Sequence, residues 1–492
     1  MNNHEDLHKI MQFVFSEIGL VYYRDKENEL CRKIDKAVKR SGAAGYREYL
    51  AMIRNNRHEI SREFDNLVSE LTIGETHFFR DEKLFMGIKD TVLPAVIEKN
   101  KNRKRLWIWS AGCATGEEVY SISILINRYF SHRLQDWDLR ITGTDINRDF
   151  LHQAINGVYT EWSFRGTPGE IKQNCFYRDE KTWHIQPEHK KNVYFQYHNL
   201  VSMPVPSIFH NLFSFDIIFC RNVMIYFDSK TIEKLIYKFQ ESLVPDGWLV
   251  VGHADHNIRY FGSFKTVMLP GTSFYLNTAG SNKGVLNNGS GLFKKPFPSG
   301  SDMAGKTALP GDPQSRSSTF EPDKRVAWEE TGKSKLSGDK RAETFIQRPS
   351  EKKPPDLPTL TALINRGKWE EASLLCEASI EATPMDATLY LLSAFILEQK
   401  GLANDAVASL RKALYLDRKF VVGHYHLGLL HQNLGDLKKA EKSFDNVINL
   451  LQNYDENFNF ELADGISARE LKALSEFHLE VLKGDERGGN TA

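Results

Sequence analysis

The sequence lacks a long apolar run and a net charge of either sign. No uninterrupted apolar stretch approaches the length of about 20 residues that a membrane-spanning helix needs, so we expect no direct insertion into a membrane. Lysine plus arginine and aspartate plus glutamate each number 64 among the 492 residues. Because these charges cancel, no global field attracts nucleic acid or anionic lipid. A basic stripe interleaved with aromatic residues and an NPPY motif are also missing, so we expect no nucleic-acid substrate.

Cysteine is scarce, and the sequence contains no CxxC motif. The five cysteines are scattered, which argues against a disulfide framework and against a structural zinc site. His253 and His256 are close in sequence, but no further ligands accompany them, so we expect no metal centre. The opening residues, MNNHEDLHKI, lack the basic and apolar regions of a signal peptide. These absences together predict a cytoplasmic protein with reduced thiols.

The composition divides the chain into several parts. A chain of 492 residues is too long for one ordinary core, so two or three domains are expected. Residues 279–356 are rich in Ser, Gly, Pro, Lys and Asp, and their apolar residues are isolated and without a period. This composition predicts a flexible linker that tethers the parts on either side without fixing their orientation.

A repeat follows the predicted linker. Gly367, Gly401 and Gly435 are spaced by 34 residues, and alanine keeps the same spacing at 372, 406 and 440. Thirty-four residues is the period of the tetratricopeptide helix pair. Residues 357–486 are therefore predicted to form an all-α repeat domain that recruits a protein partner. The alternative is an unrelated helical bundle.

Residues 1–90 show helical periodicity. In the segment LCRKIDKAVKR, Leu30, Ile34 and Val38 fall on one helical face, which predicts a buried stripe. The opposite face is basic, with Arg32, Lys36, Lys39 and Arg40. Such a face is most often simply solvated, and an acidic helical partner is the alternative reading.

The region from 105 to 277 alternates strand-like and helix-like segments. Five apolar segments have the density of parallel strands covered on both faces; they are LWIWSAG, LRITGTD, VYFQYHNL, FDIIFCRN and GWLVVGH. Two further segments, KTVMLP and SFYLN, follow without room for a helix, which predicts an antiparallel hairpin at the sheet edge. We therefore predict a doubly wound α/β domain, which binds its ligand outside the carboxyl ends of the strands.

Polar residues gather after these strands. The first strand runs into Ser110–Glu118, the second ends at Asp145 and the third at Asn199, and the fourth ends at Arg221 and Asn222. Any one of them alone would be read as a loop cap. Four such strand ends together predict a binding site, in which a carboxylate after the second strand is typical of a ribose contact.

The loop in WSAGCATGEEVYSISIL restricts the choice of ligand. It matches neither the phosphate-binding GxxxxGK[ST] motif nor GxGxxG. Glu117 and Glu118 would repel a pyrophosphate, but they suit a ligand that carries a positive sulfonium, an ammonium group and sugar hydroxyls. On these grounds S-adenosylmethionine fits better than NAD.

Five motifs then identify a family. LTIGETHFFRDEKLF, SAGCATGEEVYSI, TGTDINRDFLHQA, FDIIFCRNVMIYFD and DGWLVVGH occur in this order within residues 10–277. Together they resemble the CheR-type chemoreceptor methyltransferases, and the repeats match a subgroup with a C-terminal tetratricopeptide extension. The resemblance implies an N-terminal all-α domain over 1–90 and a seven-stranded, Rossmann-like domain over 91–278 that binds S-adenosylmethionine. A small β insertion is expected somewhere in 160–195.

The resemblance also implies a reaction. The family transfers a methyl group from S-adenosylmethionine to glutamate side chains on the cytoplasmic coiled coil of a chemoreceptor, leaving S-adenosylhomocysteine and a glutamyl methyl ester. The chain is thus expected to serve adaptation in a chemotaxis-like pathway, recruited to membrane receptor arrays. The alternative is a scaffold that binds S-adenosylmethionine and recruits signalling partners with little catalysis.

The functional residues follow from the matched motifs. Arg80 and Tyr226 correspond to the methyl-transfer centre. The cofactor contacts implied are Gly74, Thr76, Arg80, Glu118, Asp145, Asn199, Leu200, Arg221 and Asn222. Gly74 stands where many members have Asn, and Ala254–Asp255 replaces a frequent Ser-Glu pair. A glutamate acceptor is ionised at neutral pH and needs no general base, so a cation such as Arg80 is expected to align it.

Overall fold

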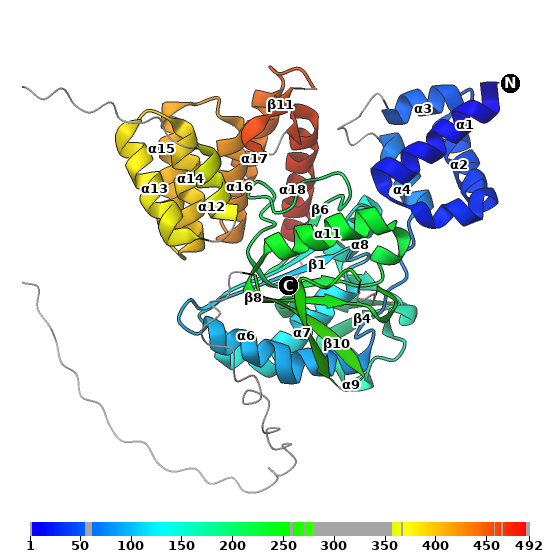
Figure 1. Cartoon of the computed structure of the whole chain (residues 1–492), viewed down its shortest axis with the longest axis horizontal. Coiled ribbons are helices and arrows are strands. Elements are labelled where there is room, and N and C mark those ends of the chain that lie inside the picture. Colours follow the sequence, from blue (N-terminus) through cyan, green and yellow to red (C-terminus); the bar gives the residue numbers. More distant parts are fainter. Residues whose placement is uncertain are drawn as a thin grey trace, which may run out of the picture. The chain divides into compact units, whose positions relative to one another are not determined.

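The computed structural model describes residues 2–54, 62–255, 259–269, 271–279, 357–365, 368–456, 458–463 and 466–488 (Figure 1). The predicted linker of residues 279–356 lies outside the described residues apart from Ala279, and so do Gly367 and His256. The chain on either side of the linker forms one compact unit, Met1–Ser281 with Lys353–Ala492. Every helix in the described ranges is too short or too polar to span a bilayer.

The N-terminal part is helical, as predicted. Its described residues form the α-helices α1 (Asn2–Phe13), α2 (Glu27–Ser41), α3 (Tyr46–Arg54) and α4 (Arg62–Leu71), with the short helices η1 (Val14–Ile18) and η2 (Val21–Lys26) between α1 and α2. The apolar stripe of α2 is buried at Leu30 and Ile34 and packs in a core with Tyr49 and Leu67. Tyr23 joins η2 to the end of α4, because its hydroxyl donates to the Leu71 carbonyl at 2.8 Å.

A seven-stranded sheet follows the N-terminal helices in the chain. Its order is β6-β2-β1-β7-β8-β10-β9. The strands are β1 (Arg105–Ala111), β2 (Asp138–Asp145), β6 (Val193–Tyr197), β7 (Phe215–Cys220), β8 (Leu243–Val251), β9 (Phe264–Leu269) and β10 (Thr272–Asn277). The first five pair in parallel, and β10 pairs antiparallel with both β8 and β9, as the sequence predicts. The strand order reverses between β1 and β7, which is where doubly wound sheets bind their ligands.

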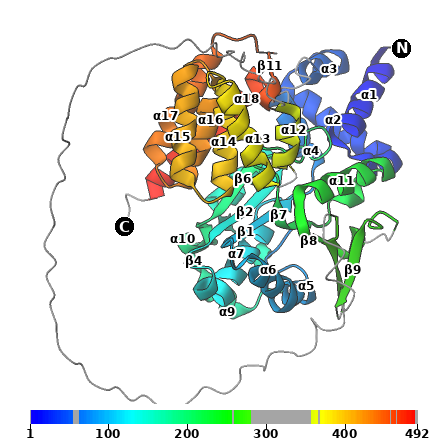
Figure 2. The same cartoon turned by 60° about the vertical axis from the view of Figure 1, so that its left-hand side comes forward.

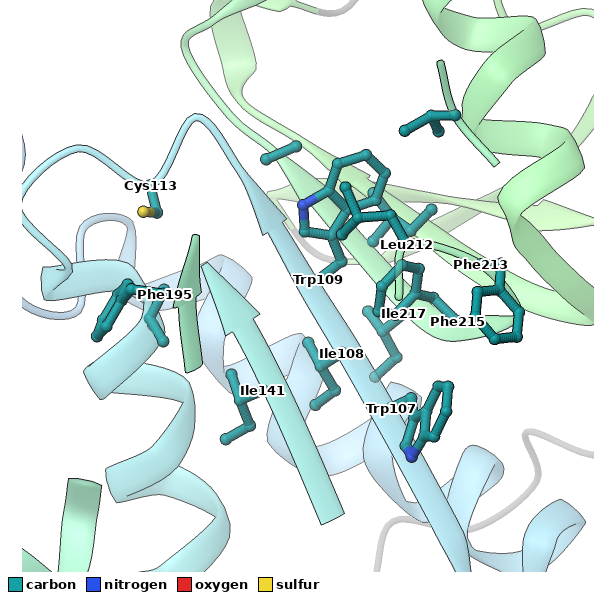
Figure 3. Packing of buried hydrophobic residues seen from close by; sticks show 14 of the residues in the cluster. Trp107, Ile108, Trp109, Cys113, Ile141, Phe195, Leu212, Phe213, Phe215 and Ile217 are labelled. Atoms are coloured by element: carbon teal, nitrogen blue, oxygen red, sulfur yellow. The ribbon is translucent and has the colours of Figure 1, made fainter. Parts of the chain in front are cut away.

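Helices cover both faces of this sheet. The helices α5 (Glu82–Gly87), η3 (Ile88–Val92) and α6 (Leu93–Asn100) precede it, and α7 (Glu117–Phe130), α8 (Arg148–Asn156) and α11 (Ser229–Ser242) connect its strands. Figure 1 shows α6 and α7 on one face and α11 on the other. Every residue of β1 is buried, and Trp107 and Trp109 fill the space beside β7 (Figure 3). A strand covered on both faces reads as an unbroken apolar run.

A small antiparallel sheet is inserted between β2 and β6. It contains β3 (Val158–Tyr159), β4 (Phe176–Asp179) and β5 (Thr182–Ile185) in the order β3-β5-β4, with α9 (Gly169–Cys175) before β4 and α10 (Pro187–Lys190) after β5. The insertion predicted within 160–195 is confirmed, but its first strand begins two residues earlier. Phe164 and Phe176 pack against Phe78, which is fully buried.

The C-terminal part consists of antiparallel helices (Figure 2). They are α12 (Leu357–Asn365), α13 (Trp369–Ala382), α14 (Ala387–Gln399), α15 (Ala403–Leu416), α16 (Val421–Asn433), α17 (Leu437–Leu451) and α18 (Ala468–Gly488). Gly401 and Gly435 follow α14 and α16 with φ of 76° and 75°, so they end these helices in the left-handed conformation. Ala372, Ala406 and Ala440 are fully buried. A two-stranded ladder, β11 (Asn459–Phe460) with β12 (Ile466–Ser467), precedes the closing helix α18 and was not predicted.

The fold class is therefore as expected: an all-α N-terminal part, a seven-stranded Rossmann-like sheet, and helical repeats. The domain boundaries drawn at 90/91, 278/279 and 356/357 stay predictions.

Close packing of α7 and β6 against β2 gives a test of the core. A Cβ at Gly143 would lie 2.8 Å from both Phe195 and Val119, whereas a Cβ at Gly169 meets nothing within 4 Å. We expect Gly143→Ala to lower the free energy of unfolding by about 1–3 kcal/mol, because the core has no room for the methyl group. Gly169→Ala, the matched control, should leave it unchanged or raise it by up to about 1 kcal/mol. Chemical denaturation measures both, and equal effects would contradict the packing argument.

Candidate active site

A cavity of about 320 Å³ opens at the carboxyl ends of the central strands. Its walls come from the loops that follow β1, β2, β6 and β7, from the segment between α4 and α5, and from the N-terminal helices. Of the predicted site residues, those that line it are Thr76, Arg80, Glu118, Asp145, Asn199, Leu200, Arg221, Asn222 and Tyr226. The sheet topology thus brings the separate sequence motifs together in one place. That these residues contact a cofactor stays a prediction.

Gly74 is the predicted residue that does not line the cavity. A Cβ at this position would lie 2.6 Å from Cζ of Phe150, which does line it. The Phe150 ring therefore fills the space that a side chain at position 74 would need. Gly74 therefore leaves room for the Phe150 ring in the wall of the cavity.

The loop after β1 brings its backbone close to neighbouring segments. Gly112 has a φ of 77°, and a Cβ there would lie 2.4 Å from Val223 in the loop after β7. Because only glycine avoids this overlap, the loops after β1 and β7 can meet and close one side of the cavity.

The two glutamates that start α7 point in different directions. Glu117 is 2% exposed and accepts hydrogen bonds from Thr115 at 2.6 Å and from Ser163 at 3.0 Å. Burial raises the pKa of its carboxyl group. The interpretation that both glutamates face the ligand is therefore wrong for Glu117, and only Glu118 lines the cavity.

Glu118 forms an ion pair with Arg221 across the cavity wall. The Glu118 Oε2 and Arg221 Nη1 atoms lie 2.9 Å apart, and their side chains are 13% and 4% exposed. Ser110 donates to the other carboxylate oxygen at 2.8 Å. Arg221 also donates from Nη2 to the backbone carbonyl of Arg80 at 2.7 Å. One guanidinium therefore balances the charge of Glu118 and holds the segment that carries Arg80.

Asp145 ends β2 as a buried carboxylate at the cavity. The backbone N–H groups of Ala114 and Asn147 each donate to it at 2.9 Å. Burial nevertheless raises the pKa of Asp145 to about 6. A buried carboxylate needs hydrogen-bond donors, and the vicinal hydroxyls of a ribose would supply them.

The loop after β6 is tied to the rest of the molecule from two sides. The Asn199 side chain donates to the Glu17 carbonyl at 2.9 Å and accepts from the Val201 N–H at 2.9 Å. Lys238 on α11 donates to the carbonyl of Leu200 at 3.1 Å and to that of Met203 at 3.0 Å. The loop after β6 is thereby fixed in place, and the Asn199 amide acts partly as a structural tie.

Asp255 holds the loop after β7. Asn222 has a φ of 58°, a conformation that asparagine tolerates better than most residues. Its N–H donates to the carboxylate of Asp255, which also accepts from Gly252 N–H at 3.2 Å. Asp255 is 7% exposed. The aspartate that replaces the frequent glutamate therefore keeps the Arg221–Asn222 turn in shape.

Arg80 and Tyr226 lie at the same cavity, on different elements. Burial raises the pKa of the Tyr226 hydroxyl, while the positive charge of Arg80 acts in the opposite direction. The Arg80 guanidinium donates from Nη1 to the carbonyl of Glu75 at 2.9 Å. The Tyr226 ring meets the Tyr22 ring edge to face, with centroids 5.7 Å apart. A cation and a neutral phenol thus stand together beside the Glu118–Arg221 pair.

Several lining residues were missed at the sequence level. Leu20 and Tyr22 come from the N-terminal part of the chain, Leu20 between η1 and η2 and Tyr22 on η2, and His77 lies within the THFFR motif. Burial lowers the pKa of His77, and the charges of Arg165 and Arg80 lower it further. No periodicity marks these residues. His77 alone carried a signal, as a titratable side chain within a motif already recognised.

The arrangement fits S-adenosylmethionine. Asp145 suits ribose hydroxyls, Glu118 suits the positive end of the ligand, and the cavity walls between them include apolar side chains such as Ile146, Phe150 and Leu200. No group of three or more potential metal ligands occurs among the residues that the structure describes. A doubly wound sheet with this site suits an S-adenosylmethionine-dependent methyltransferase.

Comparison with known proteins identifies the family. The model for the CheR methyltransferase, SAM binding domain, matches residues 74–269, and the tetratricopeptide repeat model matches 387–420 and 423–454. The chemotaxis protein methyltransferase of Borreliella burgdorferi is 31% identical over 257 residues, 51% of this chain and 88% of the relative. Chemotaxis protein methyltransferase 1 of Pseudomonas aeruginosa is 30% identical over 249 residues, 49% of this chain and 87% of that protein. The chemotaxis protein methyltransferase of Escherichia coli is 28% identical over 257 residues, 50% of this chain and 83% of that protein.

The chain therefore belongs to the CheR family of chemotaxis methyltransferases, with tetratricopeptide repeats at its C-terminal side. It is a protein-glutamate O-methyltransferase, and S-adenosylmethionine is its methyl donor.

The raised pKa of Asp145 predicts a pH-dependent affinity for S-adenosylhomocysteine. The ionised carboxylate accepts hydrogen bonds from ribose hydroxyls, and with a pKa of about 6 it is ionised at pH 8 but mostly protonated at pH 5. We expect the affinity to fall by up to about tenfold between these pH values. Calorimetric titrations at several pH values measure this.

Asp145→Asn is the matched control, because it removes the titrating group and keeps the shape. This variant should bind S-adenosylhomocysteine more weakly than the wild type at pH 8. Its own affinity should change little as the pH is lowered. If Asp145→Asn kept the pH dependence of the wild type, that dependence would belong to another group, such as His77.

Proposed function

We propose that the enzyme methylates glutamate side chains on the cytoplasmic helices of a chemoreceptor and thereby serves adaptation in a chemotaxis-like pathway. The observation that carries this proposal is the position of Arg80 and Tyr226 at the cavity that Glu118 and Asp145 also line. The names of the relatives, all chemotaxis methyltransferases, support it.

The reaction needs no general base, but it depends on where the protein places its charges. S-adenosylmethionine, when bound, supplies an activated methyl group. A glutamate acceptor is already ionised at neutral pH, so the protein has to desolvate it and bring one carboxylate oxygen into line. The acceptor's negative charge would be repelled by the carboxylates of Glu118 and Asp145. Arg221 offsets the first of these through its ion pair with Glu118.

Arg80 is the group proposed to receive the acceptor carboxylate. A guanidinium is permanently charged and offers a planar set of donors that suits a carboxylate. Its Nη1 atom is fixed by the Glu75 carbonyl, and its backbone is fixed by Arg221. Because burial raises the pKa of Tyr226, its hydroxyl stays protonated and can donate to the same carboxylate.

The basic stripe of α2 is a second proposed contact with the receptor. Lys36 lies 2.7 Å from Glu70, and Arg40 lies 3.6 Å from the same residue. Both basic side chains remain more than half exposed. An acidic receptor helix would meet the part of this charge that Glu70 does not offset.

The cellular setting belongs to the proposal as well. Receptor glutamates of this kind lie on the cytoplasmic side, so we place the enzyme in the cytoplasm and at membrane receptor arrays when active. The helical repeats bind protein. Their match to tetratricopeptide repeats supports this role.

Substitution of Arg80 and Tyr226 tests the catalytic centre. We expect Arg80→Ala to lower the rate of methyl transfer about a hundredfold and Tyr226→Phe about tenfold, because each removes a donor to the acceptor carboxylate. Tritium transfer to receptor cytoplasmic fragments, followed by release of base-labile label, measures the rate. Arg133→Ala removes an exposed arginine outside the cavity and serves as the matched control.

Affinity for S-adenosylhomocysteine, measured in parallel, separates the two candidate functions. A wild-type chain that binds this ligand but transfers no methyl group to any receptor fragment would favour the scaffold alternative. Full activity of Arg80→Ala would remove Arg80 from the mechanism.

A further inference from the structure

One face of the helical repeats is buried against the methyltransferase part of the same compact unit. This face, here called the α14/α16 face, includes Glu398 and Gln399 at the end of α14 and Tyr425 and His426 on α16. Their contacts lie on the loop of residues 205–214, between β6 and β7, and at the starts of β1 and β2.

Aromatic rings form the centre of the contact. Phe209 stacks on Tyr425, with centroids 5.0 Å apart and planes 20° from parallel. It also meets the edge of His426 at 5.4 Å. These three residues are 1%, 3% and 4% exposed. Four residues further along, Phe213 packs against Trp369 at the start of α13, with centroids 6.0 Å apart.

Two buried arginines find their partners on the repeats. Arg140 Nη2 on β2 lies 3.0 Å from Glu398 Oε1, and the two side chains are 8% and 15% exposed. Arg105 on β1 donates from Nη1 to Gln399 Oε1 at 2.7 Å and from Nη2 to the Ser214 carbonyl at 2.9 Å. A buried guanidinium without such partners would be strongly unfavourable. The buried arginines at the starts of β1 and β2 therefore depend on their contacts with the repeats.

The covered end of the sheet is opposite the cavity. Arg105 is the first residue of β1, whereas the cavity begins after its last residue, Ala111. Arg140 likewise lies near the start of β2, which ends at Asp145. Contacts at the amino ends leave the cofactor site free.

We propose that the α14/α16 face is a binding site for the methyltransferase part of the same chain, with loop 205–214 and Arg140 as its ligand. The repeats are then held against the methyltransferase part in one orientation, although the composition of the linker predicts free orientation. A further protein partner binds another surface of the repeats. This inference does not depend on the methylated substrate.

Cleavage within the linker tests the proposal on the full chain. A protease site introduced near residue 320 lets the chain be cut after folding, and gel filtration then shows whether the two fragments stay together. We expect the wild-type fragments to co-elute at micromolar concentration. Separate elution of the wild-type fragments would overturn the proposal.

Charge reversal identifies the contact. Glu398→Arg should weaken the association of the cut fragments at least about a hundredfold, because it leaves Arg140 buried beside a like charge. Glu377→Arg, on the exposed surface of α13, is the matched control and should retain wild-type association. If the cut fragments associated equally strongly in Glu398→Arg and in Glu377→Arg, the proposal would be overturned. The pair Arg140→Glu with Glu398→Arg should recover at least part of the loss.

Phe209→Ser tests the same contact from the other fragment. It leaves the repeats unaltered and should weaken association by a similar factor. Circular dichroism and S-adenosylhomocysteine binding show that each fragment remains folded, since none of the substituted residues lines the cavity. Association unchanged by both Phe209→Ser and Glu398→Arg would place the contact elsewhere.

Discussion

The Glu118–Arg221 ion pair is the interaction on which the active site depends. It joins the start of α7 to the end of β7 across the reversal in strand order, where the two halves of the sheet would otherwise leave an open crevice. An acidic wall attracts a cationic cofactor, but it also repels an anionic acceptor. Arg221 balances the charge of Glu118 and holds the Arg80 backbone, so in the proposed mechanism it would serve both demands. The breaking of such a pair would leave a buried charge without compensation.

Much of the site could be predicted from sequence, because each functional loop follows a buried strand. The carboxyl ends of parallel strands meet at one edge, so Asp145, Asn199 and Arg221 had to converge once the strands were recognised. The hairpin of β9 and β10 followed equally from the lack of room for a helix. Local patterns and topology together were sufficient for these elements.

Other features depend on tertiary packing that no local pattern contains. Consecutive residues on a helix point about 100° apart, which separates Glu117 from Glu118, but only the structure shows which of them turns into the core. Tyr22 reaches the cavity through the packing of the N-terminal helices. No local pattern marks Arg105 and Arg140 as buried, and their side chains contact residues more than 250 positions later in the chain.

Because the repeats cover the strand starts, they lie at the opposite end of the sheet from the cofactor loops. Seven residues of β1 span roughly 23 Å at the usual rise of a strand, and this length lies between the repeats at one end and the cofactor loops at the other. A protein substrate at the cavity, as proposed above, would therefore lie at the opposite end of β1 from the repeats. The strand that connects the two ends, β1, is buried along its whole length, so no part of it is open to solvent between them.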